Sequence, residues 1–523
     1  MPRSAFLLVF RLLRRRHTQY AVSPPPCGRI AWNVASRRAS LHRPAVAAGR
    51  VEAALNFLRS DSVAALLGGG ILTSDGLGQA KRVLLYSQDG LGLGHLRRSS
   101  NIAYELLSRD RECNVVIIAD SPAASFVPCW RGLDIIKLPT VVKSGRASAR
   151  KSSWTSGSLT LQVSQVMEFR TRLILDTFSA FEPDAVLIDH MPVGALGELK
   201  PTLDLALGWH RPPRLYLGLR DVLEDEAVIR EAWRDVGAYD YLRCFDAALI
   251  YGDKEIYESA RAYALEDRMK RIFYCNYVSP PPSETTVDLG PDEPYVLVTG
   301  GGGHDAFPLA SAFLDAVPTI RDELGLRGVI LAGPTMPSDH REAILARANG
   351  TVGVTTAQGG ADAWVRGASA VITMGGYNSI CEVMRWHKKA LIVPRSGPSA
   401  EQRTRAKLLA EKRIVAMLDP SELSAARLAG ELARLLSDDG IPEVASIPLL
   451  NGAGRAAEII LGGLSQSEAA PAAREEAASS TSVRATWLAE SGWQPPSKDG
   501  SQSSEGRPTD GSSKPLRRFF KTC

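Results

Sequence analysis

The order strand, glycine-rich loop, helix occurs twice in the chain, and it limits the available folds more than any other feature. The first copy occupies residues 82–108 and the second residues 295–323. Each begins with an apolar strand, continues through a loop of three or four glycines, and ends in a helix with apolar residues at helical spacing. Because strands that alternate with helices form parallel sheets covered by helices, we predict two doubly wound α/β halves.

The other predicted elements continue this alternation. We expect further strands at residues 114–120, 134–138, 184–189, 214–219, 247–251, 271–274, 328–332, 351–354, 370–372 and 390–393. Helices are expected at residues 161–180, 401–412 and 421–436. A basic stretch rich in serine and glycine, residues 141–160, is predicted to be a long loop, either functional or a mobile part of the surface.

Charge and composition limit the possible ligands and cellular compartment of the protein. The first 50 residues hold ten arginines and no lysine or acidic residue, so the rest carries 52 basic against 57 acidic side chains. This balance argues against nucleic-acid binding. The arginine-rich start is an organelle transit peptide, a poorly structured extension of a cytoplasmic protein, or an upstream segment that is not part of the mature protein. Seven scattered cysteines without a C-x-x-C pair favour a reducing compartment, and no apolar run is long enough to span a bilayer.

These patterns divide the chain into four predicted segments. They are an extension (1–80), a first α/β half (81–280), a second α/β half (281–463) and a tail rich in Ser, Ala, Glu and Pro (464–523). The extension includes a short predicted helix at 51–67, and a proline-rich linker at 279–283 marks the boundary between the halves. The composition of the tail predicts that it is disordered.

A further pair of glycines, Gly375 and Gly376, follows the predicted strand at 370–372. A helix with Glu382 in its first turn is expected next. Glycines let a ligand approach the backbone, and a helix start offers unpaired N–H groups to an anion. The polar residues after the next strand are Arg395, Glu401 and Gln402. The stretch therefore predicts one wall of a ligand site.

The glycine loops differ from the common nucleotide-binding loops. The first, residues 88–95, lacks the G-x-G-x-x-G spacing, and no glycine loop in the chain ends in Gly-Lys-Ser/Thr. Each loop alone is equally well explained as a tight turn from strand to helix. Together they lie at the carboxyl ends of parallel strands, where doubly wound sheets bind ligands.

Five motifs in this order, residues 86–98, 183–199, 217–222, 299–305 and 375–382, span the predicted halves. Over 81–463 the chain resembles GT-B glycosyltransferases of the kind that includes the lipid-linked N-acetylglucosaminyltransferase of peptidoglycan synthesis, with a family 28-like C-terminal domain. It is more closely similar to a group of predicted bacterial glycosyltransferases. The resemblance implies two Rossmann-like domains that face a cleft, the first on the acceptor side and the second binding a nucleotide sugar.

The resemblance also implies roles for individual residues. The implied donor-side residues are Gly300, Gly301, Gly302, Gly303, His304, Gly375, Gly376, Asn378, Ser379, Glu382, Arg395, Glu401 and Gln402. The implied acceptor-side residues are Gly92, Gly94, Arg97 and Arg220. Backbone N–H groups of the second glycine loop would hold the diphosphate, and Glu382 would accept from the ribose hydroxyls. Glu401 and Gln402 would bind hydroxyls of the transferred sugar.

Several of these residues also have a structural interpretation, which the sequence leaves open. Ser379 and Glu382 match a capping box, in which the serine caps the helix and the glutamate reaches back to the cap. Glu401 and Gln402 could instead be solvent-facing residues in the first turn of a helix. Arg395 could be a surface charge.

His95, which ends the first glycine loop, is the candidate general base. An imidazole titrates near neutrality and can take a proton from an attacking hydroxyl. Asp189 and Asp89 are alternative bases, and Asp189 could also orient His95 or His190. A helix-capping or phosphate-orienting role for His95 stays open as well.

We therefore expect a glycosyltransferase of the hexosyltransferase type that uses a UDP-linked sugar and needs neither a metal ion nor a cofactor. The alternatives are a nucleotide-sugar hydrolase or epimerase on the same fold, and a nucleotide-sugar-binding protein without activity. The acceptor is not identified. The basic residues within 141–160 indicate an anionic or lipid-linked acceptor, reached through peripheral contact with a membrane.

Overall fold

The protein is described by a computed structural model over residues 80–90, 92, 94–122, 124–127, 130–144, 153–280, 293–350, 352–355, 361–397 and 399–468. The chain divides into two compact units, 1–77 and 78–523, and the described residues belong to the second. The predicted helix at 51–67, the arginine-rich start and the tail beyond residue 468 lie outside the described residues, as does most of the predicted linker.

The first half forms a parallel sheet of apolar strands in the order β3-β2-β1-β6-β7-β8-β9. The strands are β1 (Arg82–Ser87), β2 (Asn114–Ala119), β3 (Leu133–Lys137), β6 (Ala185–Asp189), β7 (Arg214–Arg220), β8 (Ala247–Tyr251) and β9 (Ile272–Tyr274). β1, β6 and β8 are buried over almost their whole length, as expected for strands covered on both faces.

The second half repeats this plan in the order β12-β11-β10-β13-β14-β15, again with parallel pairing. The strands are β10 (Tyr295–Thr299), β11 (Arg327–Leu331), β12 (Gly353–Thr355), β13 (Ala370–Thr373), β14 (Ala390–Ile392) and β15 (Ala416–Met417). The second sheet follows the strand order 3-2-1-4-5-6 of doubly wound nucleotide-binding folds. The first follows the same order with β9 as a seventh strand, once the separate strands β4 (Val141–Ser144) and β5 (Ser153–Ser156) are set aside. The predicted fold class of two Rossmann-like halves is confirmed.

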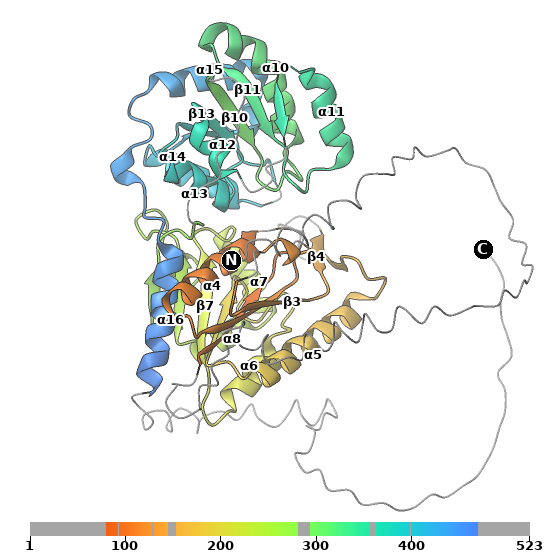
Figure 1. Ribbon diagram of the computed structural model, residues 1–523, viewed down its shortest axis with the longest axis vertical. Coiled ribbons are helices and arrows are strands. Elements are labelled where there is room, and N and C mark those ends of the chain that lie inside the picture. Colours follow the sequence, from red (N-terminus) through yellow and green to blue (C-terminus); the bar gives the residue numbers. More distant parts are fainter. Residues whose placement is uncertain are drawn as a thin grey trace, which may run out of the picture. The chain divides into compact units, whose positions relative to one another are not determined.

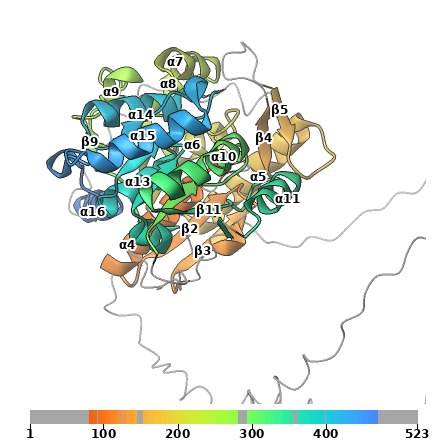
Figure 2. The ribbon, with the colours of Figure 1, turned by 90° about the horizontal axis from the view of Figure 1, so that it is seen from above.

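Helices connect the strands in both halves. In the first half they are α4 (Gly94–Arg109), α5 (Val163–Phe181), α6 (Lys200–Leu207), α7 (Glu226–Asp235), α8 (Ala238–Tyr241) and α9 (Ser259–Ala262). After β10 they are α10 (Phe307–Leu324), α11 (Ser338–Ala348), α12 (Asp362–Gly367), α13 (Tyr377–Arg385), α14 (Glu401–Glu411), α15 (Ala425–Ser437) and α16 (Gly452–Glu468). α10 packs against α15 and α11 (Figure 2).

The last helix returns to the first half. α16 packs beside α4 and also contacts β7 (Figure 1). Ala456, Ala457 and Ile460 of α16 are buried in a cluster that also contains Ile102 and Ala103 of α4. α16 extends through Leu464, the predicted start of the tail, as far as Glu468.

Two secondary-structure predictions need correction, and several elements were missed. The predicted loop at 141–160 contains an antiparallel hairpin, β4 (Val141–Ser144) and β5 (Ser153–Ser156), because residues on both sides of its middle are able to pair as strands. Its middle, residues 145–152, lies outside the described residues. The helix predicted from 421 begins at Ala425, after a short 3₁₀ turn capped by Asp419. α6 to α9, α11, α12, α16 and the two-residue strand β15 were not predicted; most of these elements are short, and short elements show little periodicity.

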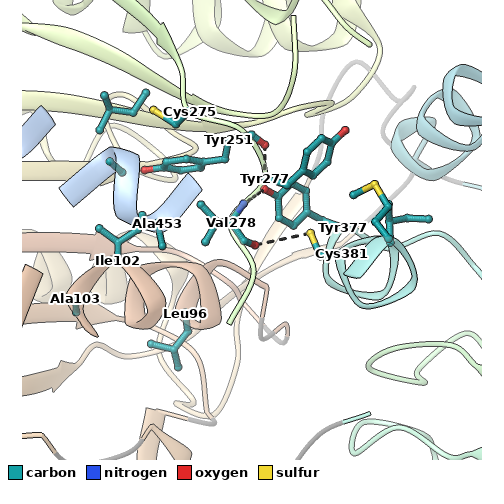
Figure 3. Close-up of a cluster of buried hydrophobic side chains, with 14 of the residues drawn as sticks. Leu96, Ile102, Ala103, Tyr251, Cys275, Tyr277, Val278, Tyr377, Cys381 and Ala453 are labelled. Atoms are coloured by element: carbon teal, nitrogen blue, oxygen red, sulfur yellow. Dashed lines mark hydrogen bonds between the residues drawn. The ribbon is translucent and has the colours of Figure 1, made fainter. Parts of the chain in front are cut away.

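One buried cluster joins the two halves. It includes Leu96 and Tyr251 of the first half, Tyr377 and Cys381 of the second, and Ala453 of α16 (Figure 3). Within the described residues, no helix combines the length and apolar character needed to cross a membrane.

Candidate functional site

Both sheets reverse their strand order at the first strand. β1 lies between β2 and β6, and β10 lies between β11 and β13. In doubly wound sheets a ligand binds at this switch point, outside the carboxyl ends of the strands. The two glycine loops, together with the residues that follow β6 and β13, therefore lie where this fold binds ligands.

Asp89 shapes the first glycine loop. Its carboxylate oxygens accept hydrogen bonds from the backbone N–H groups of His95, at 2.8 Å, and Leu96, at 2.7 Å. α4 begins at Gly94, so Asp89 caps this helix. The interpretation of His95 as the capping residue is therefore wrong, and both oxygens of Asp89 are engaged. Gly92 is exposed in the loop, and its N–H donates to the backbone oxygen of Asp89 at 3.0 Å.

His95 and Asp189 are in direct contact. Nδ1 of His95 lies 2.8 Å from Oδ2 of Asp189. Nη2 of Arg98 lies 2.6 Å from the same oxygen and 2.7 Å from Nδ1 of His95. One ring nitrogen cannot donate to Asp189 and accept from Arg98 at once. Because Arg98 already binds Asp189 through both Nη2 and Nε, we assign the Nδ1–H of His95 to Asp189, which leaves the lone pair on Nε2.

Burial and charge fix the protonation of the groups beside His95. Burial alone would raise the pKa of Asp189, but the Arg98 guanidinium and His95 hold this pKa well below its usual range. Burial, His95 and Arg220 hold the pKa of His190 well below its ordinary value, so this imidazole is neutral. The rings of His95 and His190 lie 4.8 Å apart, centroid to centroid. Asp189 thus orients His95 while His190 packs beside it.

The two predicted acceptor-side arginines contact residues predicted for the donor side. Arg97 of α4 has its Nη2 3.4 Å from Oε1 of Glu382 in α13. Arg220, at the end of β7, has its Nη2 2.9 Å from Oε2 of Glu401 in α14. These ion pairs connect side chains of the first half with side chains of the second.

The second glycine loop, residues 300–303, adopts a conformation that favours glycine. Gly301 and Gly303 have φ values of 66° and 92°. A Cβ at Gly303 would lie 2.8 Å from the backbone nitrogen of Gly333, so the backbone segments at these two glycines are in close contact. A Cβ at Gly301 would lie 3.5 Å from the hydroxyl oxygen of Ser379. The structure therefore brings the loop after β10 and the first turns of α13 together.

α13 begins earlier than the sequence pattern predicted. Its N-cap is Gly376 and its first residue is Tyr377, so Ser379 lies inside the helix and Glu382 lies in the second turn. The capping-box interpretation of Ser379 and Glu382 is wrong for this reason. Burial raises the pKa of Glu382, although the nearby Arg97 opposes this rise. The Glu382 carboxylate thus faces Arg97 rather than the end of its own helix.

At the start of α14, Gln402 is buried and the Glu401 side chain is 13% exposed. The Glu401 carboxylate lies 2.9 Å from Nη2 of Arg220 and 2.9 Å from Nη1 of Arg405. Burial alone would raise the pKa of Glu401, but Arg220 and Arg405 hold it below its ordinary value. Oε1 of Gln402 accepts from the backbone N–H of Arg395 at 3.1 Å. The interpretation of Glu401 and Gln402 as solvent-facing residues is wrong.

Arg395 lies beside the second glycine loop. Its Nε is 3.3 Å from Oδ2 of Asp305, and both side chains are about one-third exposed. His304, next to Asp305, is exposed, and Asn378, the second residue of α13, is half-buried. The predicted donor-side residues after β10, β13 and β14 therefore gather at one edge of the second sheet.

The structure adds a buried ion pair that the sequence analysis did not single out. The Arg405 guanidinium binds both carboxylate oxygens of Asp221, each at 2.7 Å, and its Nη1 donates to the backbone oxygen of Gly375 at 3.1 Å. The spacing of Glu401 and Arg405 by four residues on a predicted helix was a usable signal for their ion pair. Nothing in the sequence pairs Arg405 with Asp221.

Tyr377 lies between two arginines. The guanidinium carbons of Arg98 and Arg405 lie 5.5 and 5.7 Å from its ring centroid. Its hydroxyl donates to the backbone oxygen of Tyr251 at 2.9 Å and accepts from the N–H of Val278 at 2.8 Å (Figure 3). The first residue of α13 therefore contacts the arginine that holds Asp189.

One family model matches part of the chain. Residues 295–446 match the family model of the glycosyltransferase family 28 C-terminal domain. A comparison with curated protein sequences gave no match.

Several solved structures of glycosyltransferases are similar to the chain. CalG4, the calicheamicin glycosyltransferase, is 15% identical over 74% of this chain and 98% of its own, with a TM-score of 0.49. MurG of Acinetobacter baumannii is 15% identical over 73% of this chain and 99% of its own, with a TM-score of 0.47. UGT71G1 of Medicago truncatula, complexed with UDP-glucose, is 12% identical over 74% and 98%, with a TM-score of 0.49. These low identities and scores transfer no residue role to this chain.

The family match covers the complete second sheet, from β10 to β15. Its position on the second of two sheets with the same strand order agrees with the motifs found in the sequence. The chain thus has two parallel sheets with the doubly wound strand order expected of the GT-B fold, and residues 295–446 match the model of the glycosyltransferase family 28 C-terminal domain.

Proposed function

We propose that the protein transfers a sugar from a nucleotide-sugar donor to an acceptor hydroxyl, with His95 as the general base. The observation that carries the proposal is the 2.8 Å contact between Nδ1 of His95 and Oδ2 of Asp189 at the switch point of the first sheet. A buried carboxylate that accepts from Nδ1 fixes the tautomer in which Nε2 can take a proton.

The donor in this proposal lies along the second sheet. The backbone N–H groups of residues 300–303 and the start of α10 bind the diphosphate, since loop N–H groups and helix starts favour anions. Ser379 lies beside Gly301 and would add a hydroxyl to the same site. Glu382, buried but not used as a helix cap, accepts from the ribose hydroxyls.

The proposed reaction is a displacement at the anomeric carbon. The acceptor oxygen forms the new glycosidic bond while its proton moves to Nε2 of His95. The bond from the anomeric carbon to the diphosphate oxygen breaks, and the nucleoside diphosphate leaves with the electron pair. N–H groups of the second glycine loop stabilise the developing negative charge, as preorganised donors do in other enzymes.

The substrate classes are the finer part of the proposal. A UDP-linked hexose is supported by the sequence resemblance described above. An anionic or lipid-linked acceptor is supported by the hairpin region, where Lys143 is exposed and Leu159, Leu161 and Phe169 are 41 to 46% exposed. Exposed basic and apolar side chains of this kind suit an amphipathic acceptor.

A panel of UDP-, GDP- and dTDP-sugars, screened by thermal unfolding, tests the donor. A ligand that binds only the folded state raises its stability in proportion to the logarithm of ligand concentration above Kd. We expect stabilisation by UDP-sugars. The donor assignment would be wrong if no nucleotide sugar at millimolar concentration changed the unfolding temperature.

Release of UDP, measured with and without lipid-extract acceptors, separates the reaction classes. A transferase releases UDP only when an acceptor is present. Turnover of the donor alone would identify a hydrolase or epimerase, and tight binding without turnover under either condition would identify a binding protein. Either result would overturn the proposed transfer.

A further inference from the structure

We propose that three buried side chains, Asp120, Arg170 and Glu198, here called the anchor triad, are positioning residues that fix the glycine loop carrying His95. This inference deepens the proposed function, because it depends on His95 as the reacting group. None of the three belongs to the set of site residues expected from the sequence. They come from three separate elements, the end of β2, the middle of α5 and the segment before α6.

Asp120 contacts the glycine loop directly. It follows the last residue of β2 and is fully buried. Its Oδ1 accepts hydrogen bonds from the backbone N–H groups of Asp89, at 2.7 Å, and Gly90, at 3.0 Å. Asp89 in turn accepts from the backbone N–H of His95. Asp89 alone therefore links the Asp120 carboxylate to the backbone of His95 through hydrogen bonds.

The remaining members hold Asp120 from the other side. Nη1 of Arg170 lies 3.2 Å from Oδ2 of Asp120. Nε and Nη2 of Arg170 bind the two oxygens of Glu198 at 2.6 and 2.7 Å. The Tyr86 hydroxyl also bonds to Glu198, and Nη1 of Arg170 donates to the backbone oxygen of Pro139 at 2.6 Å. The three charged side chains of the triad are fully excluded from solvent.

The charges explain why triad and loop depend on each other. The triad itself holds two carboxylates and one guanidinium in a region closed to solvent, and the nearby Lys137 ammonium also interacts with Asp120. Burial is costly for such groups, and apolar residues often stabilise a core equally well. The N–H groups of Asp89 and Gly90 supply the missing hydrogen bonds to Asp120. The glycine loop therefore has the backbone conformation in which two of its N–H groups donate hydrogen bonds to the buried Asp120 carboxylate.

The loop conformation is demanding in itself. Gly90 has a φ of 61°, in the region that favours glycine. Ser121, the residue after Asp120, donates its hydroxyl to the backbone oxygen of Gly92 at 2.8 Å. Two consecutive residues at the end of β2 thus hold the loop at two points. Loss of the hydrogen bonds from Asp89 and Gly90 to Asp120 should let His95 leave its position beside Asp189.

Asp120→Ala tests the proposal, with Asp246→Ala as the matched control. Asp246 belongs to the same half and also accepts from one backbone N–H, that of Leu215, and from one arginine, Arg214. Asp246 precedes β8 and so lies at the amino ends of the parallel strands, whereas Asp120 follows β2 and lies at their carboxyl ends. Both variants are studied as the full chain, without any substrate, so the result does not depend on the identity of donor or acceptor.

Two measurements report the loop and the histidine. Hydrogen exchange of the peptide that covers residues 88–96 should become about tenfold faster or more in Asp120→Ala, because local opening controls exchange. The ¹⁵N spectrum of histidine-labelled protein, assigned with His95→Gln, should show the Nδ1–H tautomer of His95 in the parent and a mixture of tautomers in Asp120→Ala. Asp246→Ala should leave both signals unchanged.

The outcomes decide the proposal. Unchanged exchange and an unchanged His95 tautomer in folded Asp120→Ala would overturn it, as would equal changes in Asp246→Ala. If Asp120→Ala does not fold, Glu198→Gln is measured in the same way, and it should show a smaller change of the same kind. Full turnover by His95→Ala would disprove the proposed function alone, since the two physical measurements would still report the position of His95.

Discussion

The Arg405 guanidinium and the Asp221 carboxylate form a two-point ion pair, with both contacts at 2.7 Å, across 184 positions of sequence. Both side chains are excluded from solvent. Arg405 lies in α14 of the second half, and Asp221 directly follows β7 of the first. The pair is therefore a specific connection between the halves.

Removal of Arg405 should destabilise the protein strongly. Arg405→Ala leaves Asp221 buried without its partner, and loss of one member of a buried ion pair costs about 3–5 kcal/mol. The free energy of unfolding in urea, followed by tryptophan fluorescence, measures this change. Lys407→Ala on the same helix removes an exposed side chain whose nearest carboxylate, that of Glu411, is 3.9 Å away. We expect a change of about 0.5 kcal/mol or less for this control.

The proposed base makes a kinetic prediction. His95→Ala and Asp189→Asn should each lower kcat by about 10²- to 10⁴-fold, the contribution that general base catalysis usually makes. Binding of UDP should change little, because neither residue lies at the second glycine loop. Isothermal titration with UDP and UDP-release kinetics distinguish these effects. His210→Ala, at an exposed position, is the control. Wild-type kcat in both site variants would rule out the assigned base.

Glu401 makes a prediction about acid stability. Its pKa is lowered in the folded protein by Arg220 and Arg405, against the effect of burial. A carboxyl with a lowered folded pKa stabilises the protein above its unfolded pKa, about 4.3, and this contribution is lost as the pH falls through the folded value. The stability difference between the parent and Glu401→Gln should thus be constant from pH 7 to about 5 and shrink below about 4.

Urea unfolding of both proteins over this pH range measures the difference. Glu411→Gln, at an exposed position of the same helix, is the control variant. A stability gap that grew on acidification would contradict the ion pairs assigned to Glu401.

The second glycine loop should be intolerant of side chains at one position. Gly303→Ala introduces a Cβ at a φ of 92° and 2.8 Å from the nitrogen of Gly333, so the loop must move. Such backbone strain costs about 1–3 kcal/mol. Binding of UDP, measured by calorimetry, should weaken about tenfold or more, since each 1.4 kcal/mol is a factor of ten.

Gly430→Ala is the control for this substitution. Gly430 lies in α15, and an added Cβ meets no other atom within 4 Å. Alanine there should be neutral or stabilise the helix by up to about 1 kcal/mol. Equal UDP affinity in Gly303→Ala and the parent protein would show that the diphosphate does not bind this loop.

Much of the fold could be predicted because its signals are local. Apolar runs such as 82–87 and 247–251 identify buried strands without knowledge of their neighbours, and the glycine loops mark the turns into helices. The hairpin within 141–160 was missed because serine, glycine and basic residues dominate that stretch. Its pairing depends on strand contacts that composition does not show.

The site was predicted less completely, because its contacts are long-range. Ser379 and Glu382 have the spacing of a capping box, yet Gly376 already serves as the N-cap, and the glutamate meets Arg97 instead. Asp189 was predicted either as an alternative base or as a residue that orients His95 or His190, and only the parallel pairing of β1 with β6 places it against His95. Asp120, and the pairing of Arg405 with Asp221, gave no signal, since a long-range buried ion pair leaves no periodic pattern in the sequence.

The return of α16 to the first half affects how the chain folds during synthesis. Arg109 of α4 and Glu458 of α16 are 349 positions apart, and their side chains approach to 3.4 Å. A ribosome completes the strands of the first sheet long before it makes the helix that covers α4. Until then the side chains of α4 that contact α16 must stay exposed or be shielded by another molecule. The first half, although it is synthesised before the second, therefore completes its packing only after α16 has been made. Truncations before residue 452 remove α16 and should destabilise the first half.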